Sequence, residues 1–117
     1  MVAFPPLPVP YIHGWYGNEA LWAGVPPRGV LPAQRDPGTR EWGTKFPWWR
    51  VLHGTLTVTA RRLDGPSAGF RGEVPGGYGS FGFVPSGLVW PSPGCWRVTG
   101  RVAHHSLTIV MRVQVHG

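Results

Sequence analysis

The sequence has little cysteine, little acid and no long apolar run. Cys95 is the only cysteine, which excludes a disulfide within the chain and leaves only an intermolecular one. No stretch of 18 apolar residues occurs, so we expect no membrane-spanning helix. The opening "MVAFPPLPVP" lacks the charged start and continuous apolar core of a signal peptide. If the protein is exported, its signal is therefore absent from this chain.

Acidic residues and side-chain amides are both scarce. Five Asp and Glu stand against 11 Lys and Arg, for a net charge of +6. Ten of the 11 basic residues are arginine, scattered singly apart from Arg61-Arg62, whereas nucleic-acid binding usually needs a clustered patch. We therefore favour a solvated positive surface over a nucleic-acid site. The only amides are Asn18, Gln34 and Gln114, which with abundant proline fits a thermophilic source, although a GC-rich genome gives the same composition.

The patterns that are present predict an all-β fold. No segment keeps an apolar period of 3.6 residues, and 18 Gly and 14 Pro indicate many turns. Residues 55–60 alternate threonine with apolar residues, as a half-buried strand does. Residues 95–102 and 106–115 alternate in the same way across His104-His105, which predicts an antiparallel hairpin. With about seven to nine short strands, we expect an immunoglobulin-like antiparallel β-sandwich.

The chain divides into a Pro-rich arm at residues 1–14 and one β-sandwich domain at residues 15–117. The arm carries Val2, Phe4, Leu7 and Val9 among four prolines, so it has apolar side chains with which to dock on its own domain or on a neighbour. Residues 19–25 and 29–33 are further candidate strands. The segment "KFPWWRVL" predicts an edge strand or a bulge, because proline cannot donate to a ladder.

Four segments resemble a known family: "KFPWWR", "LTVTARRLDGP", "GYGSFGFVPSGLVWPSPGCWRVTGRV" and "SLTIVMRV". They are similar to an uncharacterised domain of predicted exported bacterial proteins and lipoproteins. The similarity runs from about Trp15 to Val113, and its most specific part is "GCWRVTGR". The resemblance implies an extracytoplasmic β-sandwich and brings no site residues. The chain lacks the lipobox cysteine of that family, and Arg97 stands where an acidic residue is common.

No catalytic or metal site is predicted. Cys95 has neither a base nor soft-metal partners near it in sequence, so we interpret it as a packing residue that points away from the core face of Trp96. His104 and His105 are expected as solvated turn residues, although a cluster with His13, His53 and His116 can be imagined. No two of the five carboxylates share an element at the spacing of an acid–base pair; Asp64 is expected to cap a turn or to pair with Arg61 or Arg62. We expect no enzyme activity, no cofactor and no metal.

The seven tryptophans are the remaining candidates for a binding site. Trp90 and Trp96 are expected in the core, and the other five are too many for one small core to bury fully. Consecutive Trp48 and Trp49 must face opposite ways in a strand. Because Trp and Arg dominate interface hot spots, the candidate binding residues are Trp15, Trp22, Trp42, Trp48, Trp49 and Arg50.

The leading hypothesis is a non-enzymatic extracytoplasmic interaction or assembly module, such as a surface or fibre-forming subunit. In it, the Pro-rich arm extends to a neighbouring subunit and adds to an exposed sheet. The alternative is a ligand-binding module of the carbohydrate type that uses exposed aromatics. A metal-binding or nucleic-acid-binding domain is the third class.

Overall fold

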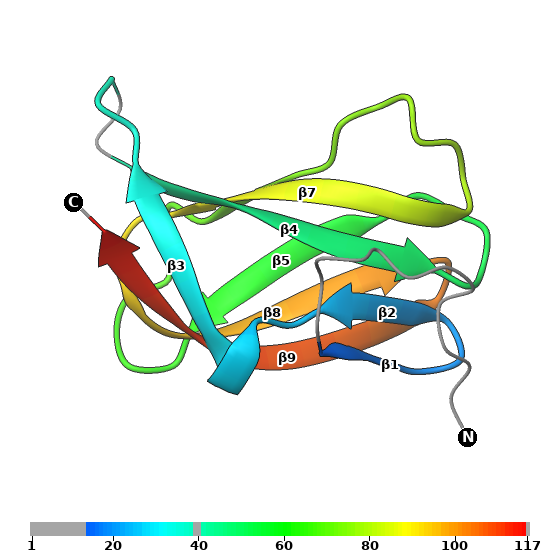
Figure 1. Ribbon diagram of the computed structural model, residues 1–117, viewed down its shortest axis with the longest axis horizontal. Coiled ribbons are helices and arrows are strands. Elements are labelled where there is room, and N and C mark those ends of the chain that lie inside the picture. Colours follow the sequence, from blue (N-terminus) through cyan, green and yellow to red (C-terminus); the bar gives the residue numbers. More distant parts are fainter. Residues whose placement is uncertain (1–13, 39–40, 117) are drawn as a thin grey trace.

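The computed structural model describes residues 14–38 and 41–116, and this part of the chain is all-β (Figure 1). The Pro-rich arm up to His13 lies outside the described residues. The elements are β1 (Trp15–Gly17), β2 (Leu21–Gly24), the short 3-10 turn η1 (Pro27–Gly29), β3 (Val30–Arg35), β4 (Trp42–Arg50), β5 (Thr57–Arg62), β6 (Arg71–Glu73), β7 (Gly82–Trp90), β8 (Gly94–Val102) and β9 (His105–His116).

The nine strands form one mixed sheet. Its main path runs β1-β2-β4-β3-β9-β8-β5, and β7 pairs with both β4 and β6. Every pairing is antiparallel except that of β3 with β9, so the expectation of a purely antiparallel sheet was wrong. Parallel neighbours need a long connection, and the whole stretch from β4 to β8 supplies it here. Sequence periodicity carries no information about such a pairing.

The sheet folds back on itself so that two halves face each other across the core. The ring centroids of Trp90 on β7 and Trp96 on β8 are 5.2 Å apart. Gly100 on β8 lies against β4 and β2: a Cβ at that position would be 2.7 Å from Trp48 Cη2 and 3.0 Å from Leu21 Cδ2. A side chain would not fit there, and glycine therefore permits the close approach of the two halves.

The C-terminal hairpin agrees with the sequence prediction. β8 and β9 pair in register from Gly94 opposite Val113 to Val102 opposite His105, and the two residues between them form the turn. The predicted core face is buried at Trp96, Val98, Gly100 and Val102, and at Leu107, Ile109, Met111 and Val113. Only Val115, near the end of β9, is exposed.

The sequence predicted an edge strand or a bulge in the region of β4. β4 is an interior strand, so the edge-strand alternative was wrong, and its register with β7 is unbroken from Trp42 to Arg50, without a bulge. It pairs along its full length with β7 on one side, and with parts of β2 and β3 on the other. The Val51 N–H donates to Ala20 O, so odd-numbered residues of this stretch direct their backbone groups toward β2. Pro47 has the same parity but lies beyond the last β2 partner, Ala23 opposite Trp48. Its missing N–H thus faces a gap between β2 and β3 and costs no ladder bond.

Candidate functional site

Three of the six candidate binding residues are buried in the folded domain. Trp22 and Trp48 are 5% and 0% exposed, and Arg50 is 2% exposed. Trp48 Nε1 donates to Ser86 Oγ at 2.8 Å, and that hydroxyl donates to Phe46 O. These residues are part of the interior, together with the expected Trp90 and Trp96. They cannot form a contact surface on the folded domain.

Trp15, Trp42 and Trp49 are half-buried. Trp49 faces away from Trp48, as expected, and packs edge-on against Phe81 with ring centroids 6.4 Å apart. The Arg35 guanidinium lies over the Trp42 ring, 5.6 Å from its centroid. The indole nitrogens of Trp15 and Trp49 are buried without an acceptor among the residues that the structure describes. The structure does not bring these three rings together at one site.

Arg50 organises two connections of the fold. Its guanidinium donates to five backbone carbonyls: Gly54 at 3.0 Å, Tyr78 at 2.7 Å, Gly79 at 2.9 Å, Phe81 at 3.3 Å and Gly82 at 3.3 Å. Burial lowers the pKa of Arg50, while the carbonyl oxygens replace the water that would solvate the charge. One buried side chain therefore holds the Gly-rich β6–β7 connection against the β4–β5 connection.

The carboxylates are used in turns and ion pairs. Glu41 binds Arg71 through both oxygens, at 2.8 and 3.1 Å, and raises the pKa of that arginine. Asp36 accepts the Gly38 N–H at 2.7 Å in the connection between β3 and β4. Asp64 pairs with Arg62 at 2.9 Å, and pairing with this arginine was one of the predicted alternatives. Glu73 approaches the same Arg71 guanidinium, 3.5 Å from its Nε, so one arginine holds both Glu41 and Glu73.

Cys95 lies at the start of β8 on the face opposite Trp96. Its side chain is half-buried, so the buried-packing interpretation holds only in part. Its backbone N–H donates to both Asp64 oxygens, at 3.2 and 3.3 Å, and its carbonyl accepts the Leu63 N–H at 2.8 Å. The bond from Arg62, followed by that from Cys95, lowers the Asp64 pKa. The segment holds the β5–β6 turn in place.

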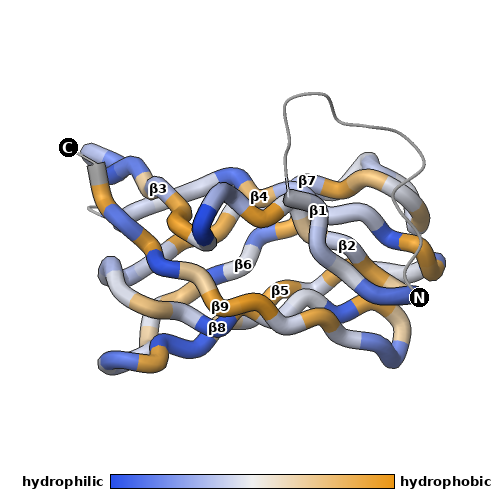
Figure 2. Tube along the Cα trace, turned by 60° about the horizontal axis from the view of Figure 1, so that its bottom comes forward, coloured by the Kyte–Doolittle hydropathy of each residue, from blue (hydrophilic) through white to orange (hydrophobic). Residues whose placement is uncertain are grey.

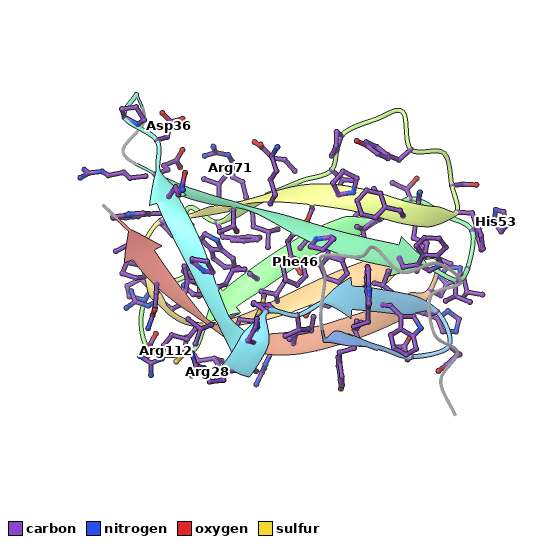
Figure 3. All side chains as sticks on the ribbon, in the orientation of Figure 1. Arg28, Asp36, Phe46, His53, Arg71 and Arg112 are labelled. Carbon is purple, nitrogen blue, oxygen red and sulfur yellow. The ribbon has the colours of Figure 1, made fainter. Side chains whose placement is uncertain are left out.

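The described histidines form no cluster with carboxylates or with Cys95 that could hold a metal ion. Figure 3 shows Asp36 and His53 at opposite ends of the long axis. His53 is exposed, stacks on Phe81 with ring centroids 4.9 Å apart, and contacts Ser80 Oγ at 3.1 Å. His104 and His105 are exposed at the β8–β9 turn, where they were expected. In residues 14–38 and 41–116, no group of three His, Cys, Asp or Glu could hold a metal ion.

An apolar groove of about 540 Å³ lies beside β9. We call it the β9 groove; it is lined by Gly14, Tyr16, Val25, Pro26, Pro27, Arg28, Gly29, Thr108, Ile109 and Val110. Tyr16 and Val110 are each 55% exposed, the highest values among the exposed large apolar side chains of the described residues. Figure 2 shows the alternating hydropathy of β9 and the apolar stretch near its label.

A free strand edge runs along this groove. On one side β9 pairs with β8 from His105 to Val113, whereas on the other side β3 pairs only with Arg112–His116. Ser106 O accepts a bond from the Asn18 side chain, so even-numbered residues of β9 direct their backbone groups away from β8. By the same alternation, the N–H and C=O groups of Thr108 and Val110 point into the groove. No described strand pairs with them there.

Sequence reasoning missed this site because it lies on the face that the pattern marks as outer. Val110 is the one apolar residue at an even position between Ser106 and Gln114. That break in the alternation of β9 was a signal for an apolar outer surface. Tyr16 and the Pro26-Pro27 wall, which complete the groove, gave no comparable pattern.

Comparison of the chain with family models, curated proteins and solved structures finds no match. The resemblance to an exported bacterial domain therefore stays a prediction. Within the described part of the chain, none of the helical segments has the length and hydropathy to cross a membrane.

Proposed function

We propose that the protein is a non-enzymatic interaction module that acts outside the cytoplasm and accepts an extended peptide segment at the edge of β9. The observation that carries the proposal is the free N–H and C=O edge of Thr108 and Val110 inside an apolar groove. A strand edge of this kind offers backbone hydrogen bonds to any extended chain. The exposed Val110 and Tyr16 side chains add apolar surface to be buried.

The groove has the features that strand addition requires. Its volume of about 540 Å³ is within the range of protein ligand sites, roughly 300–1,000 Å³. Asn18 bonded to Ser106 closes one end, and Gly29, whose Cβ would lie 3.6 Å from Val110 O, borders the other. The exposed edge is therefore short, which matches one short strand rather than open-ended pairing.

We also propose that the folded-over sheet is an immunoglobulin-like β-sandwich with the arm at its start. β3 supports this reading, because it pairs with β4 in one half and with β9 in the other. An extracytoplasmic location rests on the family resemblance alone. A β-sandwich with loops at its ends is a common scaffold for surface recognition.

The proposed function is tested by placing a charged side chain at the edge of the β9 groove. Val110→Lys places a solvated ammonium where an apolar contact is needed, and we expect self-association or partner binding to weaken by about tenfold or more. The domain should still fold, because the Val110 side chain is exposed. Light scattering over a concentration series measures the effect, and Thr59→Lys, on the exposed face of β5, is the matched control. Equal behaviour of the two variants would contradict the proposal.

A second candidate function is carbohydrate binding at the β6–β7 connection. Tyr78 and Phe81 are 44% and 47% exposed there, and Phe81 stacks with His53. Flat aromatic faces of this kind also stack on sugars, and Arg50 holds the connection in place beforehand. Binding on a glycan array that is lost in Phe81→Ala would support this function, whereas no binding by the wild type would contradict it.

A further inference from the structure

We infer that the segment accepted by the β9 groove is Leu7–Tyr11 of the Pro-rich arm of a second copy of this chain. The inference rests on the proposed function and names its partner. Thirteen residues precede the described part of the chain. The first described residue, Gly14, itself lines the groove, so the residue to which the arm is joined lies beside the free edge.

The arm has a pattern that suits pairing on one side only. In "LPVPY", Leu7, Val9 and Tyr11 alternate with Pro8 and Pro10. Successive backbone N–H groups of an extended strand point to opposite edges. In that conformation the three non-proline residues donate on one edge, and the other edge has no donor. Such a segment can add to a sheet but cannot itself accept a further strand of the ordinary kind.

The spacing of the arm matches that of β9. On β9, the groove-facing residues Thr108 and Val110 are two positions apart. The arm has the same spacing between its donors Leu7, Val9 and Tyr11. Paired residues in neighbouring strands project their side chains to the same face. The apolar side chains of the arm would then lie beside Val110, which is 55% exposed. Backbone bonds and apolar burial thus favour the same alignment.

The direction of β1 favours a second copy over the arm of the same chain. Gly14 O accepts the Val25 N–H at 3.2 Å, and β1 then runs to Asn18, which contacts Ser106 at the start of β9. An arm that folded straight back into its own groove would have to reverse immediately before Gly14. It would then run parallel to β9, which is the less stable pairing.

The length of the arm allows it to reach another molecule. Thirteen extended residues span up to about 43–47 Å, whereas the longest dimension of the molecule is 36 Å. A second arm can also enter antiparallel to β9. Because the arm and the groove are different surfaces, two copies can exchange arms reciprocally in a closed dimer, or each arm can enter the next copy in a ring or filament.

The test uses two full-length variants, each lacking one half of the contact. Val9→Pro removes the central N–H of the arm, and Val110→Lys blocks the groove. We expect wild type to form concentration-dependent oligomers and each variant alone to be monomeric by light scattering. An equimolar mixture should recover heterodimers, because the Val110→Lys variant still has its arm and the Val9→Pro variant still has its groove. Val2→Pro, outside the paired segment, should assemble as wild type does.

Three outcomes separate the inference from the proposed function. If Val110→Lys dissociates the oligomer but Val9→Pro does not, the groove binds another segment, so the inference fails while the proposed function stands. If each variant alone is monomeric but the mixture forms no heterodimer, the arm does not join two copies and the inference fails. If wild type is monomeric at all concentrations and Val110→Lys changes no partner binding, both fail.

Discussion

Replacing Arg50 by methionine is expected to lower the free energy of unfolding by about 3–5 kcal/mol, which places it among the most damaging single changes. Methionine matches the unbranched stem of arginine but has no guanidinium and donates no hydrogen bond, so all five carbonyl contacts are lost. Urea unfolding measures the loss. Limited proteolysis should also show faster cleavage in the connection at residues 74–81, because three of the five carbonyls belong to it and a fourth, that of Gly82, begins β7.

Two further variants test the cause of this loss. Arg50→Lys keeps the charge but has three donors in place of five, so its unfolding free energy should lie between those of wild type and Arg50→Met. Arg61→Met removes an exposed arginine on β5 and should change stability by no more than about 0.5 kcal/mol. Equal stability of Arg50→Met and Arg61→Met would contradict the assigned role of Arg50.

Val98→Asp is expected to abolish folding. Val98 is 0% exposed on the core face of β8, and an aspartate there buries a charge without a partner. The neighbouring Thr99→Asp should cost about 1 kcal/mol or less, because Thr99 faces outward and its hydroxyl contacts that of Thr108 at 3.1 Å. Far-UV circular dichroism and thermal unfolding distinguish the two. Equal damage from both would mean that both faces of β8 are buried in the protein.

The contrast between Val98 and Pro47 shows which parts of the fold can be predicted from sequence. The faces of β5, β8 and β9 follow from alternation because one face of each is buried and the other is wet. The position of β4 does not follow from its sequence. Pro47 faces a gap between β2 and β3, and that gap is created by segments distant in the chain.

The candidate site, like the fold, could be predicted from the sequence only in part. Tryptophan and arginine side chains are common in interfaces, but Trp48 and Arg50 are buried by packing that composition cannot reveal. The β9 groove depends on where β3 stops pairing with β9 and where β1 begins. These are properties of the sheet. The one local signal was Val110, an apolar residue on an otherwise polar face.

Amide hydrogen exchange at Thr108 and Val110 tests the central claim most directly. We predict that, in concentrated wild type, at least one of these two amides exchanges about tenfold or more slowly than in Val9→Pro. The reason is that the arm of a second copy accepts the hydrogen bond of that amide. The amides of Ile109 and Met111, which face β8, should be protected equally in both proteins and serve as internal controls. Identical exchange of Thr108 and Val110 in the two proteins would contradict the account.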